Sequence, residues 1–262
     1  MHNEFYDKYE IIKELSCSTH SKVYLVRHRI LDVYRVAKIF SGNQQDARRL
    51  MKEAHLIKNL KHPHIPVIYD IEQNIGEDND SICIIEEYID GKSLRQYVHD
   101  ETDTRGYLSV HEICRIGIEL CCILEYLHGY NGNGILHMDI KPDNIMLDKD
   151  GKVKLIDYDN AVEGNAGLTV ESGSPLYAAP EQYNREKAVI QSDIYSLGMV
   201  ILFMVSHGHI VTDENHKLSE ISSRYSSLYH VINKSLHHEW GLRYSSVTYL
   251  KQELQSIMNW GG

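Results

Sequence analysis

Residues 134–159 read GILHMDIKPDNIMLDKDGKVKLIDYD, and this stretch decides how the rest of the chain is interpreted. It places carboxylates between short apolar runs, although apolar runs seek a core and carboxylates avoid one. The runs at 145–147 and 152–156 flank the tetrapeptide DKDG (148–151). That tetrapeptide is a favourable turn because glycine tolerates positive φ. The stretch therefore predicts a β-hairpin with acidic groups just before it and just after it.

Three polar side chains around this hairpin have the character of metal ligands. Asp139 precedes the hairpin, Asn144 opens it and Asp157 follows it. Convergence of these groups at one edge would create a cluster of hard oxygen ligands. Such a cluster suits Mg²⁺, which keeps several waters and binds substrate phosphates. Each residue taken alone is equally well explained as a turn or cap residue.

The composition is ordinary for a soluble globular protein of one large domain or two modest lobes. The formal net charge of the 262 residues is −10, which argues against binding to nucleic acid or to an anionic membrane. The five cysteines form no Cys-x-x-Cys pair, so we expect reduced thiols and a cytoplasmic location. We also expect no signal peptide and no membrane segment, because the longest apolar run, 197–205, is too short to span a bilayer.

The first part of the chain predicts strands with one helix. Apolar residues recur at helical spacing from Ala47 to Leu60, and Pro63 ends that helix. Segments rich in β-branched and aromatic residues predict strands at 9–15, 22–28, 34–40 and 81–89.

The second part of the chain predicts mostly helices. Ser109 and Glu112 have the spacing of a capping box that opens a long amphipathic helix. Further periodic segments predict helices near 192–206 and 245–258. The polar stretches 73–80 and 99–107 are interpreted as loops.

Several motifs in order along nearly the whole chain resemble the protein kinase superfamily, in particular the catalytic domain of bacterial (Hanks-type) serine/threonine protein kinases. The resemblance implies an α+β, bilobal fold: a small, mainly-β N-lobe with one helix (1–87) and a larger, mainly-α C-lobe (88–262). The motifs that carry it are the catalytic loop 137–144, Asp157-Tyr158-Asp159 in place of D-F-G, Ala179-Pro180-Glu181, the strand around Lys38, Glu53 on the helix, Asp193 at the start of the central helix, and Arg243.

The resemblance implies transfer of the γ-phosphate of ATP to a serine or threonine hydroxyl, with Mg²⁺ as cofactor. Lys38 would hold the α- and β-phosphates, and Glu53 would hold Lys38. Asp139 would accept or orient the hydroxyl proton, and Lys141 would stabilise the transferring phosphate. The segment GSPLYAAPE (173–181) implies a protein substrate rather than a small molecule. The implied Mg²⁺ ligands are Asn144 and Asp157, the implied structural pair is Glu181 with Arg243, and Asp193 would brace the catalytic loop.

The implied nucleotide site combines residues from both predicted lobes. Adenine would lie between Val23 and Ala37 on one side and Met146 on the other. Backbone groups of the hinge would read the edge of the base. The hinge residues are Glu87, Tyr88 and Ile89, and the phosphate loop contains Ser16, Ser18 and Ser21.

The phosphate loop departs from the family pattern, because those three serines stand where the family has glycines. A serine forced into strained φ/ψ costs about 1–3 kcal/mol, although its hydroxyl can donate to a phosphate oxygen. Asp159 also replaces the last glycine of D-F-G. These departures keep a second hypothesis open: a pseudokinase that acts as a nucleotide-binding or scaffolding module.

Two further departures concern regulation. Met138 replaces the arginine that in the family pairs with a phosphate on the activation segment, so we expect phosphorylation at Thr169 or Ser172 not to switch activity. Glu86 stands at the gatekeeper position, where a buried carboxylate needs a partner. Lys38 is the expected partner, unless the register is shifted by one residue and Glu86 faces water.

Overall fold

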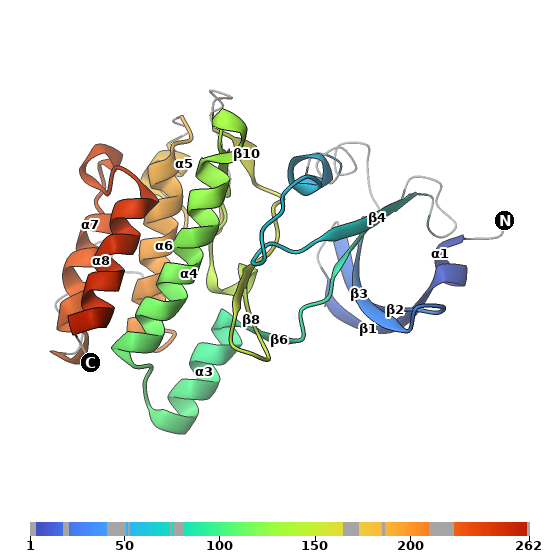
Figure 1. Ribbon diagram of the computed structural model, residues 1–262, viewed down its shortest axis with the longest axis horizontal. Coiled ribbons are helices and arrows are strands. Elements are labelled where there is room, and N and C mark those ends of the chain that lie inside the picture. Colours follow the sequence, from blue (N-terminus) through green and yellow to red (C-terminus); the bar gives the residue numbers. More distant parts are fainter. Residues whose placement is uncertain are drawn as a thin grey trace. The chain divides into compact units, whose positions relative to one another are not determined.

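The computed structural model describes residues 4–17, 21–40, 51, 53–73, 75, 81–164, 173–184, 187–209 and 223–260. The chain divides into two compact units, 1–90 and 91–262. The smaller unit is built mainly of strands and the larger one mainly of helices (Figure 1). This division confirms the predicted α+β fold class.

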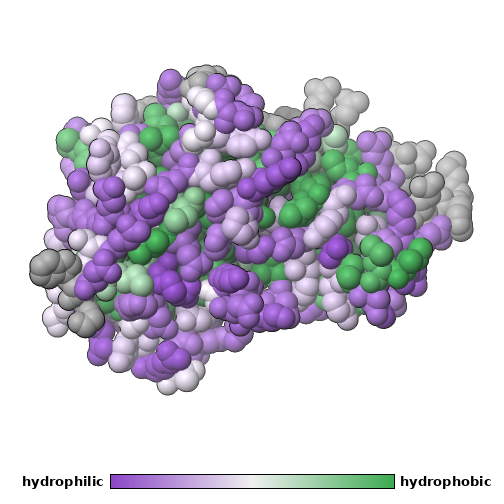
Figure 2. All heavy atoms as spheres, in the orientation of Figure 1, coloured by the Kyte–Doolittle hydropathy of each residue, from purple (hydrophilic) through white to green (hydrophobic). Residues whose placement is uncertain are grey.

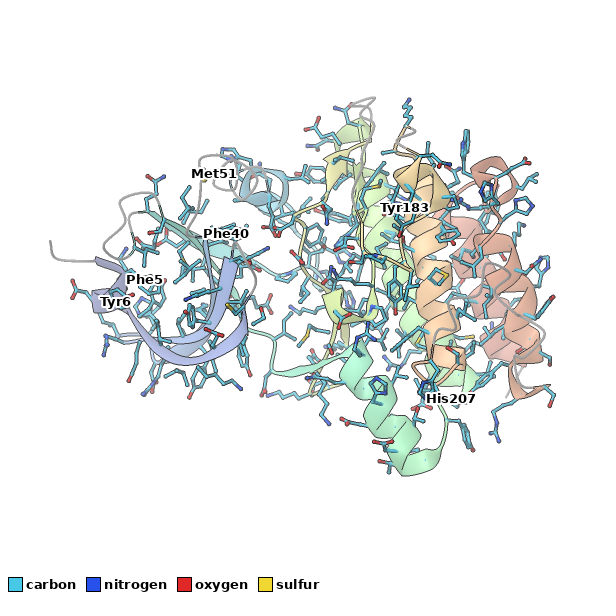
Figure 3. The ribbon with its side chains drawn as sticks, turned by 180° about the vertical axis from the view of Figure 1, so that it is seen from behind. Phe5, Tyr6, Phe40, Met51, Tyr183 and His207 are labelled. Atoms are coloured by element: carbon cyan, nitrogen blue, oxygen red, sulfur yellow. The ribbon has the colours of Figure 1, made fainter. Side chains whose placement is uncertain are left out.

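The small unit is a five-stranded antiparallel sheet with the strand order β1-β2-β3-β5-β4. Each face carries its own apolar cluster, one containing Phe5 of the first helix and the other containing Phe40 and Ala54 (both phenylalanines are labelled in Figure 3). The sheet is therefore covered on both faces, which makes it a stable platform for the side chains described below. Its elements are α1 (Glu4–Lys8), β1 (Tyr9–Cys17), β2 (Ser21–His28), β3 (Val33–Phe40), a helical stretch at 53–57, β4 (Ile68–Gln73) and β5 (Ile82–Glu87).

The four predicted strands correspond to β1, β2, β3 and β5. The strand β4, with the sequence IYDIEQ, is not predicted by the sequence pattern. It lies at an edge of the sheet and leaves Tyr69, Asp70 and Gln73 exposed. Edge strands tolerate polar side chains on both faces, so the alternation that signals a half-buried strand is blurred there.

The larger unit is organised around two long helices, α4 and α6. The apolar run in α6 is buried along nearly its whole length, as expected for a helix at the centre of a domain. The face drawn in Figure 2 correspondingly shows mostly hydrophilic side chains over the larger unit. The elements are β6 (Gly91–Ser93), α3 (Leu94–Arg105), α4 (Val110–His128), η1 (Tyr130–Gly132), β7 (Ile135–Leu136), η2 (Pro142–Asn144), β8 (Ile145–Asp148), β9 (Val153–Leu155), β10 (Val162–Glu163), α5 (Pro180–Tyr183), α6 (Ile190–Val205), η4 (Ser223–Leu228), α7 (Tyr229–Ser235), η5 (Trp240–Leu242) and α8 (Val247–Trp260).

The capping box predicted for α4 is present. The Glu112 amide donates to Ser109 Oγ at 3.1 Å, and the Ser109 amide donates to Glu112 Oε2 at 2.9 Å. The predicted helices near 192–206 and 245–258 correspond to α6 and α8. Among the described residues, no helix combines the length and the apolar character needed to cross a membrane.

The interpretation of 99–107 as a loop is wrong, because helix α3 covers most of it. The helix buries Leu94 and Val98 and leaves most of its polar second half exposed, so that half resembles a loop. Its start carries a capping box from Ser93, which the sequence analysis missed, and it ends at Gly106 with φ +78°. The interpretation of 73–80 as a loop falls mainly outside the described residues, and Gln73 belongs to β4.

Candidate active site

The catalytic loop holds Asp139 in a buried position with its oxygens directed at specific donors. Lys141 Nζ donates to Asp139 Oδ2 at 2.8 Å, and the Ser174 amide donates to Asp139 Oδ1 at 3.0 Å. Lys141 Nζ also donates to Ser174 Oγ at 2.7 Å. A carboxylate, an ammonium group and a hydroxyl therefore meet at one point, where a proton acceptor and a phosphate-binding cation would be needed together.

The electrostatics keep Asp139 ionised. Burial by itself would raise the pKa of this carboxyl group. The hydrogen bond and the charge of Lys141 more than compensate, with help from Ser174, so the pKa of Asp139 lies below that of an ordinary aspartate. Asp139 is thus a carboxylate at neutral pH, as a proton acceptor must be.

Asp193 of α6 braces the backbone of the same loop, as expected. Its two carboxylate oxygens accept hydrogen bonds from the amides of His137 (3.0 Å) and Met138 (2.9 Å). His128 Nε2 lies 2.9 Å from the same carboxylate. Met138 has φ +64°, a conformation that costs a non-glycine residue about 1–2 kcal/mol, and the fully buried Asp193 holds its amide in that conformation.

The Met138 side chain fills an apolar environment. It is 1% exposed and packs in a cluster with Leu136, Val162 and Ala188. A methionine side chain carries no positive charge, so it cannot replace the arginine of the family as the partner of a phosphate on the activation segment.

A Thr169→Ala/Ser172→Ala double variant should therefore phosphorylate a peptide as fast as the wild type does. Both residues lie outside the described part of the chain, and the prediction depends on the surroundings of Met138. The measurement compares initial rates of the two proteins after each has been incubated with ATP. A large loss of rate in the double variant would show that a phosphate on this segment is required after all.

The hairpin brings Asn144 and Asp157 next to each other. The strands β8 and β9 pair with Ile145 opposite Leu155, and the Ile156 amide donates to the Asn144 carbonyl at 2.9 Å. Asn144 Nδ2 donates to the backbone and side chain of Asp139, which leaves Asn144 Oδ1 as an oxygen ligand. An amide oxygen and a half-buried carboxylate fit the oxygen preference of Mg²⁺.

The small unit contains the predicted ion pair between strand β3 and its helix. Lys38 Nζ donates to Glu53 Oε2 at 3.1 Å, and both side chains are at least 90% buried. Glu86 is half-buried and lies opposite Val36 in the β3–β5 pairing, in the register that puts it on the face of the sheet that carries Lys38. The expected register of Glu86 is thus confirmed, and Lys38 pairs with Glu53 in this conformation.

The expected contact between Ala37 and adenine is contradicted by the sheet. Neighbouring residues of a strand point to opposite faces, so Ala37 lies on the side away from Lys38. It is fully buried in the cluster that contains Phe5. Val23 pairs with Lys38 across β2 and β3 and shares its face, as does Val36, two residues before Lys38. Residues two apart in a strand share a face, so counting back two residues from Lys38 identifies Val36, not Ala37, as the residue on the adenine side.

The other residues predicted for the nucleotide site belong to the hinge, to strand β8 and to the phosphate loop. The amide of Glu87 donates to the Val67 carbonyl at 2.9 Å, so a purine edge would be read by other hinge groups, including those of Tyr88 and Ile89. Met146 is half-buried in β8 of the larger unit. Ser16 lies at the end of β1 opposite Val23, Ser21 begins β2, and Ser18 lies outside the described residues.

The predicted pair of Glu181 and Arg243 is present as a buried bidentate ion pair. Arg243 Nη1 and Nη2 donate to the two Glu181 oxygens at 2.7 and 2.9 Å. Burial would raise the pKa of Glu181, but Arg243 and Ser192 hold it below its ordinary value. The other three N–H groups of Arg243 donate to the carbonyls of His237, Gln191 and His238.

Gln182 is a positioning residue that the sequence analysis missed. Its Nε2 donates to the Met138 carbonyl and its Oε1 accepts from the Ala179 amide, both at 3.0 Å. Gly173, with φ +121°, passes so close that an added Cβ would lie 2.9 Å from Gln182 Nε2. Because residue 173 is a glycine, Gln182 can lie against the segment that carries Ser174 and still hydrogen-bond to Met138 of the catalytic loop. No local sequence signal indicates a contact across 44 residues.

A family model described as the protein kinase domain matches residues 9–260. The chain belongs to the protein kinase family. This kinase domain is 31% identical over 208 residues to a probable serine/threonine-protein kinase of Clostridium perfringens, covering 76% of this chain and 29% of that protein. It is also 31% identical over 220 residues to the serine/threonine-protein kinase PrkC of Bacillus subtilis, covering 81% of this chain and 32% of PrkC.

The solved structures support the same fold. The crystal structure of the PknI kinase domain of Mycobacterium tuberculosis matches with a TM-score of 0.75 and 24% identity, covering 95% of this chain and 96% of that one. This likeness concerns the fold alone. The kinase domain spans about a third of the length of the two relatives named above, 29% and 32% of their sequences.

Proposed function

We propose that this kinase domain is an ATP- and Mg²⁺-dependent serine/threonine protein kinase that transfers the γ-phosphate to a protein hydroxyl. The observation that carries the proposal is the group of Asp139, Lys141 and Ser174. A buried, ionised carboxylate at 2.8 Å from an ammonium group is suited to accept a hydroxyl proton beside a cation that binds the transferring phosphate.

The other groups have defined parts in the proposal. Lys38, held by Glu53, binds the α- and β-phosphates. Val23, Val36 and Met146 are the apolar side chains that would contact adenine, and backbone groups of residues 87–89 would read its edge. Bound Mg²⁺ would neutralise phosphate charge, and Asn144 and Asp157 are the residues that would hold it.

The alternative is a pseudokinase, favoured by Ser16, Ser18 and Ser21 in the phosphate loop and by Asp159. Both hypotheses allow nucleotide binding, but turnover belongs to the kinase alone.

Two measurements test the proposal. MgATP at 100 times its Kd should stabilise the folded chain by about 2.7 kcal/mol, which is a rise in melting temperature of about 5–10 °C at this size. Label should then pass from ATP to serine or threonine in a mixed protein substrate. Stabilisation without label transfer would favour the pseudokinase, and the absence of both effects would exclude the two nucleotide-binding hypotheses.

A further inference from the structure

Arg95 and Asp143 form a two-pronged ion pair at the outer side of the catalytic loop. Arg95 Nε and Nη2 donate to the two carboxylate oxygens of Asp143, both at 2.7 Å. Asp143 lies in the turn η2 between Lys141 and Asn144. Asn144 points inward and is 5% exposed, whereas the Asp143 side chain is 47% exposed. The pair therefore lies on the solvent-exposed side of the loop that carries Asp139 and Lys141.

The surroundings of Arg95 hold its guanidinium group in place. The group lies 5.2 Å from the ring centroid of Phe203, a buried residue of α6. It also lies close enough to Tyr177 for the phenol and the guanidinium group to shift each other's pKa. Tyr177 follows Ser174 by three residues, and Ser174 contacts both Asp139 and Lys141. Arg95 thus sits between the two segments that flank the catalytic carboxylate.

Helix α3, which carries Arg95, is itself anchored within the larger unit. An added Cβ at Gly208, just beyond the end of α6, would lie 2.8 Å from the ring of His99 in α3. Figure 3 accordingly shows the labelled His207 beside α3. A guanidinium group on an anchored helix, with planar two-point geometry, loses less side-chain entropy on pairing than one on a mobile stem. The pair is therefore better defined than an ordinary exposed salt bridge.

The charge of Asp143 would otherwise recruit a basic residue. A half-exposed carboxylate beside an acceptor site attracts an arginine or lysine of the incoming protein. Here a guanidinium group of the same chain already occupies both oxygens. An incoming cation would have to share these oxygens with Arg95 or displace it, and in both cases would meet the positive charge of Arg95.

We propose that Arg95 is a specificity-determining residue that occupies Asp143 and so directs this kinase domain toward acceptor proteins without a basic residue next to the serine or threonine. The inference rests on the proposed kinase function. It predicts that acceptor peptides with a neutral residue next to the serine or threonine bind as tightly as peptides with arginine there. Removal of the Arg95 charge should convert the same site into one that selects arginine.

The test uses binding, so that it does not depend on phosphate transfer. Fluorescent peptides with a central serine carry arginine at one flanking position at a time, or alanine at all of them, and their Kd values are measured by anisotropy. The proteins are the wild type, Arg95→Met, which keeps an apolar stem of similar length, and Arg95→Met/Asp143→Asn. Lys92→Met is the matched control: it removes one positive charge from an exposed pair with Asp100, on β6 just before α3.

The wild type and Lys92→Met should bind alanine and arginine peptides equally. Arg95→Met should bind at least one arginine peptide about five- to tenfold more tightly than the alanine peptide, as a charge-assisted hydrogen bond predicts. The double variant should lose that preference. An unchanged ratio in Arg95→Met, or a preference for arginine already present in the wild type, would overturn the proposal. Absence of label transfer with the predicted binding pattern would count against the kinase function alone.

Discussion

Replacing Asp139 by asparagine should lower the rate of phosphate transfer to protein by about 10²–10⁴-fold, the usual contribution of a positioned proton acceptor. Asparagine has nearly the same shape, but its amide cannot accept the proton of the attacking hydroxyl. Its nitrogen would also face a hydrogen-bond donor, either Lys141 Nζ or the Ser174 amide, which both now donate to the carboxylate. The measurement is the initial rate of label transfer at saturating MgATP.

The control for this variant is Asp150→Asn, the same substitution at an exposed position in the hairpin turn. Its rate should equal that of the wild type. Thermal melting with and without MgATP should show that Asp139→Asn still folds and binds nucleotide. A folded Asp139→Asn protein with undiminished transfer would mean that the proposed proton acceptor is wrong.

Replacing Arg243 by methionine should lower the free energy of unfolding by about 3–5 kcal/mol, the usual cost of breaking a buried ion pair from one side. The side chain of Arg243 has no exposed area and that of Glu181 is 3% exposed. The substitution leaves the Glu181 carboxylate buried with Ser192 Oγ as a remaining donor at 2.7 Å. Urea denaturation of the two proteins at neutral pH measures the difference.

Three comparisons test whether the loss of stability comes from the buried ion pair. Arg105→Met removes a 60% exposed arginine that pairs with Glu101, and should cost less than about 1 kcal/mol. Adding Glu181→Gln to Arg243→Met should restore part of the loss, because no charge is then left buried. An Arg243→Met protein as stable as Arg105→Met would contradict the assigned role of the pair.

The pH dependence provides the third comparison, and its direction follows from the pKa of Glu181. That pKa is lowered in the folded wild type, so the pair contributes its full stability above the pKa of an unfolded glutamate. The contribution is lost as pH falls through the folded pKa. In Arg243→Met the buried carboxyl group can take up a proton instead, so the difference between the two proteins should shrink in acid.

The sequence by itself determined the features that depend on neighbouring residues. The capping box of Ser109 and Glu112 spans one helical turn, and the DKDG turn joins two adjacent strands, so both are visible as short patterns. The ion pairs Lys38–Glu53 and Glu181–Arg243 are long-range, and they were found because several motifs in order resemble a family. The edge strand β4 and helix α3 were missed because their polar residues hide the periodic pattern.

The tertiary structure decided which side chains share a surface. The pairing of β2 with β3 puts Val23 and Val36 on the face of the sheet that carries Lys38. Ala37 lies on the other face, in the apolar cluster that contains Phe5. Folding also brings Gln182 to Met138 across 44 residues and Arg95 to Asp143 across 48. Such contacts leave no local pattern, since they depend on how whole elements pack and not on the spacing of residues along the chain. The residue types of the candidate active site are thus a property of the sequence, whereas the pairing of Asp143 with Arg95 is a property of the fold.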